Sequence, residues 1–286
     1  MSESKREEAY RIVVLDLECV PNEKATYSDK GKLVVDTNAR NTIQLAVCEL
    51  DGTVVVPEMN INPCVDWKKN EGFLSYTAKC WKVKKEEVPV SALQLPIFSA
   101  AIRKAVVLIE EKLGKNVILC CHNGKQWDIP ILHNQCKANG ILITLLNGAI
   151  GFDTRFIMCK LGKKPDSKDK TWALDTTYKR LFEQPISRGH TASADTQALG
   201  RLLREYMRQK GIHKEAELVK RLFNEERKGI FELPWSKGFV AAEKATEGVE
   251  WHFKQVVDKI KNGKGAEKFK DPELEKLFIQ LQKLTI

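Results

Sequence analysis

The spacing of apolar and polar residues predicts an α/β domain in the first 210 residues. Runs of β-branched and aliphatic residues predict strands, and the Asp51-Gly52 pair between two such runs favours a hairpin. Apolar residues at helical spacing predict helices. The predicted strands cover residues 11–19, 42–50, 53–56 and 116–121, and the predicted helices cover 96–113, 128–139, 153–161, 172–182 and 191–210. Three early strands followed by helix, strand and further helices indicate a mixed sheet, whereas residues 60–90 read as irregular.

From residue 211 the pattern changes to helices separated by glycines, with apolar faces within residues 249–260 and 274–284. Residues 201–286 carry 19 Lys and Arg against 14 Asp and Glu, which is more than half of the net charge of +9. We therefore expect a domain over residues 8–210 and a basic helical C-terminal extension over residues 211–286. A packed, solvated pair of helices is the simpler reading of the extension, and a surface for a partner is the alternative.

Two acids interrupt the end of the first predicted strand, in Arg11-Ile-Val-Val-Leu-Asp-Leu-Glu-Cys19. Side chains two residues apart on a strand point to the same side, so Asp16 and Glu18 are expected to project together. Two like charges held that close repel each other unless a cation lies between them. The alternative is a strand end that frays into water.

Polar residues also break the pattern at two later places. In Cys121-His-Asn-Gly-Lys-Gln-Trp-Asp128 a core strand ends in a turn and a helix begins, and Asp128 could simply cap that helix. In Gly189-His-Thr-Ala-Ser-Ala-Asp195 a loop leads into the helix of residues 191–210, where Asp195 gains from the helix dipole. If His190 lies in that loop, its ring can fold back over the site that Asp195 faces.

Composition narrows the class of protein. The net charge of +9 and the pI near 9 favour a polyanionic partner, nucleic acid first and an acidic membrane surface second. Eight cysteines without a C-x-x-C pair do not suggest zinc, and a reducing compartment is expected. No apolar run approaches the roughly 18 residues of a membrane span. We expect a soluble intracellular protein of cytoplasm or nucleus, with no membrane contact.

Taken in order, D-x-E, H-N-G-x-x-x-D and H-x-A-x-x-D resemble the motifs of the DEDDh, or DnaQ-like, family of 3′-to-5′ exonucleases. The similarity spans residues 10–206 and is strongest to the three-prime repair exonuclease branch. It implies a ribonuclease H-like fold, with a mixed five-stranded sheet flanked by helices and an α-helical C-terminal extension. It also implies catalytic roles for Asp16, Glu18, Asp128, His190 and Asp195, of which the four carboxylates would hold two Mg²⁺ or Mn²⁺ ions. Such oxygen ligands suit hard cations, and histidine titrates near neutral pH, so His190 could take a proton from the attacking water.

The same resemblance suggests residues that contact substrate. These are Leu17, Cys19, Asn123 and Trp127, together with Lys163 and Lys164 in a charged loop that also contains Lys168 and Lys170. Trp127 could stack on a base, or could equally be a core residue at the helix start. After Glu18 the chain continues Cys-Val-Pro-Asn, unlike the small residues and glycine common in the family.

The leading hypothesis is a metal-dependent 3′-to-5′ exonuclease that releases nucleoside 5′-monophosphates from single-stranded DNA or RNA. The competing hypothesis is a nucleic-acid-binding regulator that reuses the exonuclease fold to grip RNA. The presence of all five expected active-site residues argues against the second. DNA cannot be distinguished from RNA by sequence, because the 2′-hydroxyl is read by local geometry. A homodimer is left open.

Overall fold

The computed structural model describes residues 10–22, 24–26, 36–114, 116–141, 149–161, 173–187 and 189–234. The chain divides into two compact units, residues 1–237 and 238–286. The second unit, with the apolar helix faces expected at 249–260 and 274–284, lies outside the described residues.

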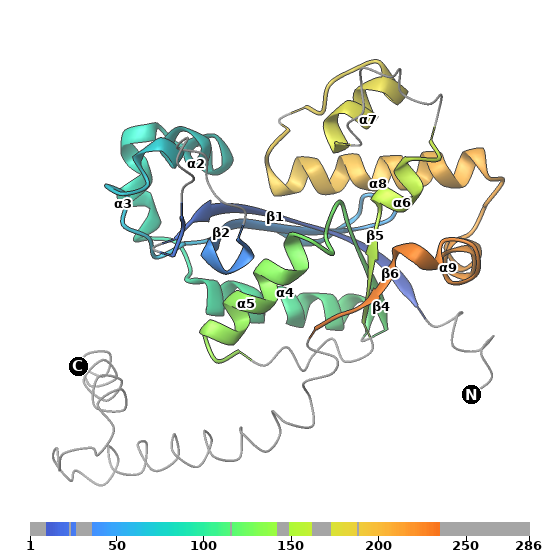
Figure 1. Cartoon of the computed structure of the whole chain (residues 1–286), viewed down its shortest axis with the longest axis horizontal. Coiled ribbons are helices and arrows are strands. Elements are labelled where there is room, and N and C mark those ends of the chain that lie inside the picture. Colours follow the sequence, from blue (N-terminus) through green and yellow to red (C-terminus); the bar gives the residue numbers. More distant parts are fainter. Residues whose placement is uncertain are drawn as a thin grey trace, which may run out of the picture. The chain divides into compact units, whose positions relative to one another are not determined.

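Six strands of the described residues form one mixed sheet in the order β3-β2-β1-β4-β5-β6 (Figure 1). β1, β4 and β5 run parallel to one another. The other three pairs are antiparallel: β1 with β2, β2 with β3, and β5 with β6. The strands are β1 (Arg11–Pro21), β2 (Arg40–Glu49), β3 (Val54–Asn60), β4 (Val117–Cys121), β5 (Ile150–Asp153) and β6 (Ile230–Glu232). The mixed sheet with β1 near its centre matches the expected ribonuclease H-like fold.

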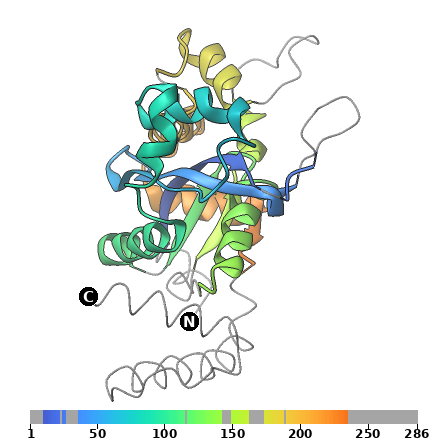
Figure 2. The same ribbon diagram turned by 90° about the vertical axis from the view of Figure 1, so that its left-hand side faces the viewer.

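Helices cover both faces of the sheet (Figure 2). Alternation of side chains along β1 decides which of its residues meet which helices. Val13, Leu15 and Leu17 point into the cluster formed with α4 and α5, whereas Ile12 and Val14 point into the cluster formed with α8 and α9. Both sides are buried, which explains the continuous apolar run at the start of β1. The helices on the first face are α4 (Phe98–Leu113) and α5 (Asp128–Ala138), and those on the second are α6 (Arg155–Met158), α7 (Leu174–Phe182), α8 (Ala192–Gln209) and α9 (Glu215–Asn224).

A smaller third cluster covers the far end of β1 and β2. It is built from α2 (Leu74–Trp81) and α3 (Val88–Ala92), whose Trp81 donates an indole N–H to the carbonyl of Ile43 at 2.9 Å. The prediction that residues 60–90 are irregular was wrong here, because apolar packing stabilises helices too short to show a clear period. Three 3-10 turns each precede an element: Thr37–Ala39 precedes β2, Glu71–Phe73 precedes α2 and Lys85–Glu87 precedes α3.

The predicted α/β architecture and mixed sheet are confirmed, with three differences. The sheet has six strands among the described residues instead of five. Residues 150–153 form β5, which was not predicted, and the helix expected over residues 153–161 is the shorter α6. Residues 211–237, expected in the extension, contribute α9, the 3-10 turn Arg227–Gly229 and β6 to the same unit as the sheet. Among the described residues, no helix is both long enough and apolar enough to span a membrane.

Candidate active site

Asp16 and Glu18 lie on the same side of β1 as Ile12 and Val14, as the alternation predicts. The body of α8 covers this side of β1 at Ile12 and Val14. The helix begins at Ala192, and its first turn lies near the two acids. Asp195 is in that first turn, and carboxylate oxygens of Asp16, Glu18 and Asp195 come within 4.8 Å of one another. Three acids from the two ends of the predicted domain therefore meet at one point.

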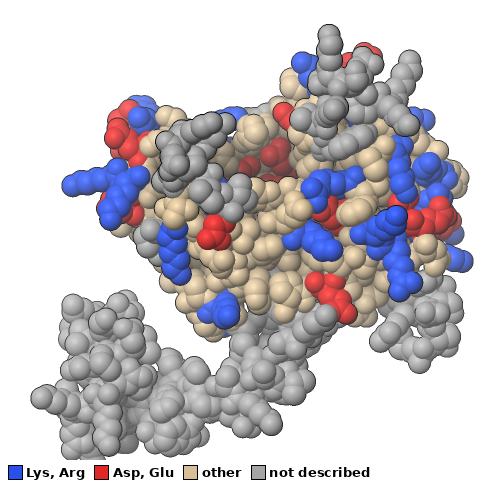
Figure 3. Space-filling model, viewed as in Figure 1, with Lys and Arg blue, Asp and Glu red and all other residues tan. Residues whose placement is uncertain are grey.

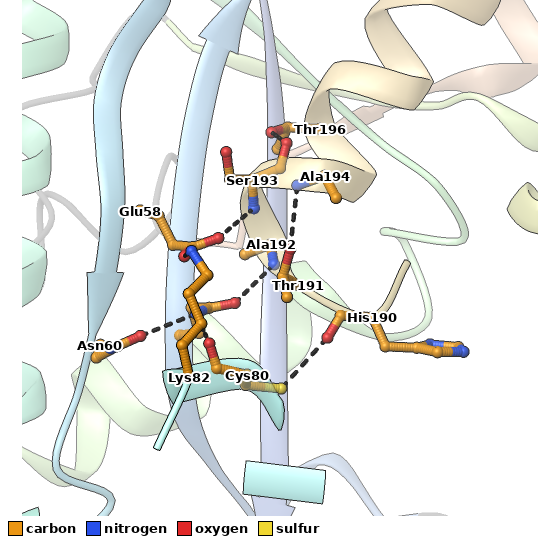
Figure 4. Close-up of polar contacts among 11 residues, drawn as sticks. Glu58, Asn60, Cys80, Lys82, His190, Thr191, Ala192, Ser193, Ala194 and Thr196 are labelled. Atoms are coloured by element: carbon orange, nitrogen blue, oxygen red, sulfur yellow. Dashed lines mark hydrogen bonds and ion pairs between the residues drawn. The ribbon is translucent and has the colours of Figure 1, made fainter. Parts of the chain in front are cut away.

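The first turn of α8 is held over the sheet by acceptors for its backbone N–H groups. Gln44, the cross-strand neighbour of Glu18, accepts from Ala192 at 2.8 Å, and Glu58 accepts from Ser193 at 3.4 Å. The Thr191 hydroxyl accepts from Ala194 at 3.3 Å, as an N-cap residue does (Figure 4). Because the anchors come from β2 and β3, the position of Asp195 is coupled to the strand next to Glu18.

Asp128 reaches the same site from the other side of β1. β1 pairs with β4 only from Arg11 to Val14, so the N–H of Leu17 has no strand partner there. Asp128, a residue that is only 6% exposed, accepts that N–H at 3.2 Å. Asp128 begins α5 directly after the H-N-G turn, which requires a glycine, since a Cβ on Gly124 would lie 2.1 Å from Cβ of Cys121.

His190 lies on the loop before α8, with its backbone held on both sides. Its N–H donates to Asp195 at 3.2 Å, and its carbonyl accepts from the thiol of Cys80 at 3.3 Å. Lys79 donates to the carbonyl of Gly189 at 2.7 Å, so α2 holds this loop. A φ of +67° places His190 in the left-handed region, which histidine adopts more readily than most residues. Its exposed ring points away from the network around Thr191 (Figure 4) and lines the cleft described next.

A cleft of about 930 Å³ opens over Asp16, Asp128, His190 and Asp195. Acidic side chains lie at the floor of a hollow on the face drawn in Figure 3, with lysine and arginine side chains on the surface beside it. The cleft is lined by Asp16, Leu17, Cys19, Arg40, His122, Asn123, Trp127, Asp128, Ile131, Arg155, Ala173, Leu174, Asp175, Ile186, Gly189, His190 and Asp195. Residues of the H-N-G-x-x-x-D segment, of the H-x-A-x-x-D segment and of the end of β1 therefore line one cleft.

The three clustered acids and Asp128 all have pKa values above their ordinary range, and burial is the largest cause in each case. The pKa of Asp16 is raised well above normal, with further increases from the charges of Asp128, Glu18 and Asp195. The pKa of Glu18 is raised to about 7 although the Tyr76 hydroxyl, which donates to Glu18, opposes the shift. The pKa values of Asp128 and Asp195 are raised to about 7 and about 6. Each carboxylate is thus costly to ionise at neutral pH without added positive charge.

The donor set suits divalent hard cations. The four acids offer only carboxylate oxygens, the ligands that Mg²⁺ and Mn²⁺ prefer. Within the described residues none of the four forms an ion pair with lysine or arginine. Lys79 lowers the pKa of Glu18 and Asp195, but its ammonium is bonded to the Gly189 carbonyl. The donor set consists of carboxylates without a Lys or Arg ion-pair partner among the described residues, and it therefore fits the expected ions.

The expected substrate residues divide into two groups. Leu17, Cys19, Asn123 and Trp127 line the cleft. Lys163 and Lys164, with Lys168 and Lys170, lie outside the described residues. Burial raises the pKa of the Cys19 thiol, which therefore stays protonated and is a poor nucleophile.

The residues at the site that were not predicted include Tyr76, Lys79, Arg40 and Arg155. Tyr76 and Lys79 come from α2, in the segment expected to be irregular. Arg40 begins β2 and lies with its guanidinium carbon 5.8 Å from the centroid of the Trp127 ring, and Arg155 begins α6. None of them belongs to a motif. For Tyr76 and Lys79 the nearby Trp67 and Trp81 were the only signal that this segment packs on the domain.

No protein-family model matches the sequence, and a search of curated proteins gives no match. Among solved structures, the chain is similar to a zinc-bound form of E. coli exonuclease I in complex with single-stranded DNA, at 12% identity and a TM-score of 0.48, over 71% of this chain and 41% of that one. It is also similar to a second structure of exonuclease I, at 12% identity and a TM-score of 0.49, over 75% of this chain and 43% of that one. The chain thus spans less than half the length of both proteins. Similarities this distant assign no function to the chain. A functional proposal has to rest on the chemistry of the cleft.

Proposed function

We propose that the chain is a metal-dependent 3′-to-5′ exonuclease of the DEDDh type, which releases nucleoside 5′-monophosphates from the 3′ ends of single-stranded DNA or RNA. The observation that carries this proposal is the meeting of Asp16, Glu18 and Asp195 within 4.8 Å, with Asp128 and His190 lining the same cleft. These five residues come from β1, α5, the loop before α8 and α8 itself.

In this proposal each residue has one task. Asp16, Glu18, Asp128 and Asp195 would hold two Mg²⁺ or Mn²⁺ ions, which supply positive charge that stabilises the transition state of phosphodiester hydrolysis. His190 accepts the proton of the attacking water on an imidazole nitrogen, since its ring is exposed on the wall of the cleft. Trp127 offers an aromatic face to a base. Asn123 has a buried side-chain oxygen that has no hydrogen-bond partner in the part of the chain that the structure describes, and this oxygen could accept from a sugar hydroxyl.

The test is hydrolysis of 3′-labelled and 5′-labelled single strands of DNA and RNA in Mg²⁺, Mn²⁺ or EDTA. We expect a 3′ label to appear as mononucleotide at the earliest times, and activity to require a divalent ion. Asp195→Asn and Asp16→Asn should each lower the rate roughly a hundredfold or more, because each removes charge where the transition state needs it. The matched control is Asp66→Asn, a change at an exposed loop outside the cleft.

Full activity of either site variant would refute the assignment. Tight binding of the labelled strands without cleavage in any metal would instead support a nucleic-acid-binding regulator. The DNA and RNA arms of the same assay decide which polymer is preferred.

A further inference from the structure

Arg155 lines the cleft in an orientation set by a buried carboxylate. Asp153 at the end of β5 is fully buried, whereas the Arg155 side chain is 34% exposed. Its Nε lies 3.2 Å from both oxygens of Asp153, and its Nη2 lies 2.9 Å from Oδ2. One edge of the guanidinium is thus bound to the protein while the residue lines the cleft.

Asp153 is itself fixed by the backbone. Its Oδ1 also accepts the N–H groups of Asn123 at 3.2 Å and of Arg155 at 3.1 Å. This ties the H-N-G turn and the start of α6 to one carboxylate, so Arg155 has little freedom to swing. The remaining nitrogen, Nη1, has one contact among the described residues, with Oε1 of Gln126 at the long distance of 3.5 Å. It is therefore available to an anion in the cleft.

The strand that leads into Arg155 is not the one that carries Asp16 and Glu18. β5 is two strands away from β1, which corresponds to about 9.5 Å at the usual strand spacing. An arginine tethered at β5 and ions held at Asp16 and Asp195 would thus serve different phosphates. When an exonuclease removes the 3′-terminal nucleotide, every phosphate other than the one cleaved lies on its 5′ side.

We propose that Arg155 binds a phosphate of the substrate strand on the 5′ side of the phosphate that is cleaved. Arg155 is then a specificity-determining residue, which makes the enzyme favour longer strands over dinucleotides. This inference rests on the proposed function. The competing explanation is that Arg155 only neutralises the buried charge of Asp153, a purely structural role.

The experiment measures kcat/KM in Mg²⁺ for single strands of two, three, four and five nucleotides with 5′-hydroxyl ends. The dinucleotide contains only the phosphate that is cleaved, so it is the internal reference. For the wild type we expect a step in kcat/KM at the length that first supplies the phosphate bound by Arg155. In Arg155→Ala the ratio of longer strand to dinucleotide should fall roughly tenfold to hundredfold, the usual effect of a lost hydrogen bond to a charged group.

Two more variants separate binding from folding. Arg155→Ala leaves a buried charge without its partner, so the double variant Asp153→Asn with Arg155→Ala removes that charge while keeping an acceptor for both backbone N–H groups. It should lose the step as well. Arg155→Lys keeps the charge without the planar fork and should retain part of the step. The matched control is Arg103→Ala, on an exposed position of α4 outside the cleft.

Salt dependence provides a second readout that a structural role would not move. The slope of log kcat/KM against log salt for the pentanucleotide should become flatter by about 0.7 in Arg155→Ala and be unchanged in Arg103→Ala. An unaltered step and slope in the Arg155 variants would overturn the inference. So would an equal loss at every length, including the dinucleotide. No cleavage by the wild type at any length would instead refute the proposed function, and this inference with it.

Discussion

At the scale of single residues, the clustered acids have an unusual relation to stability. Glu18, Asp128 and Asp195 have folded-state pKa values raised to about 7, about 7 and about 6, with burial as the main cause. An acid whose pKa is raised by folding adds stability below its unfolded pKa, near 4, and that stability is lost as the pH rises through the folded pKa. Without metal, the folded protein should therefore lose stability between about pH 4 and pH 7.

Glu18→Gln tests this expectation. In EDTA at pH 8 the variant should be more stable than the wild type by about 2 kcal/mol, since a buried ionised carboxylate is replaced by a neutral group that still accepts from Tyr76. At pH 4 the difference should nearly vanish, because Glu18 is then protonated in the folded state and largely protonated in the unfolded chain. The measurement is the urea unfolding free energy at both pH values.

Added Mg²⁺ should reverse the order at pH 8, because ion binding stabilises the wild type and not a variant that lacks a ligand. The control is Glu111→Gln, at an exposed position of α4, which should change stability little at either pH. A variant less stable than the wild type at pH 8 in EDTA would contradict the expectation.

Alternation along one strand is enough to place Asp16 and Glu18 together, because it depends only on local backbone geometry. Asp128 and Asp195 were assigned by motif and lie at the same cleft. Tyr76, Lys79, Arg40 and Arg155 could not be found this way. Their places depend on how separate elements pack, and no local pattern in the chain records that.

At the scale of elements, the first turn of α8 depends on one buried amide. Gln44 is fully buried, accepts from the N–H of Ala192, and donates to Asn60 at 2.8 Å and to the carbonyl of Cys80 at 2.9 Å. It therefore joins β2, β3, α2 and α8. The turn with Asp195 is held by this amide, and the loop with His190 is held by Lys79 and Cys80 of α2.

Gln44→Ala should lower the unfolding free energy by about 2–3 kcal/mol, because a buried N–H and a buried carbonyl lose their partners. It should also lower kcat, since Asp195 is no longer anchored against the strand beside Glu18. Urea unfolding and the nuclease assay measure the two effects. The matched control, Gln209→Ala, removes an exposed glutamine that bonds Glu205 at the other end of α8 and should affect neither. Unchanged stability of Gln44→Ala would contradict the role given to this amide.

The elements that were predicted well are long or have a sharp local signal. β1, α4 and α8 have 11, 16 and 18 residues, and the hairpin follows its Asp-Gly pair. β5 and β6 have four and three residues, too few for a period to show. They exist because each completes its hydrogen bonds on a neighbour that lies far away in sequence. The same holds for α2, which is stabilised by packing more than by its own pattern.

At the scale of the whole molecule, the positive charge is concentrated in the first compact unit. Residues 238–286 contain nine lysines, no arginine and eight acidic residues, so nearly all of the net charge of +9 belongs to residues 1–237. Much of the positive charge counted above over residues 201–286 lies at residues 201–210, at the end of α8, and not in the extension. The electrostatic attraction to a polyanion should therefore remain when residues 238–286 are removed.

Two truncations distinguish the boundary expected at residue 210 from the one at residue 237. A chain of residues 1–237 should keep the thermal midpoint of the domain and its nuclease activity.

A chain of residues 1–210 should lose cooperative folding, because α9 buries Leu218, Val219 and Leu222 completely, each worth about 1.5–3 kcal/mol. It would also lose β6 from the edge of β5 and Glu226, which accepts from the buried Tyr206 hydroxyl at 2.6 Å. These losses together approach the 5–15 kcal/mol that holds a typical domain folded. Calorimetry and far-ultraviolet circular dichroism measure the outcome, and a cooperative transition of the shorter chain at the midpoint of the full chain would show that α9 and β6 belong to the extension.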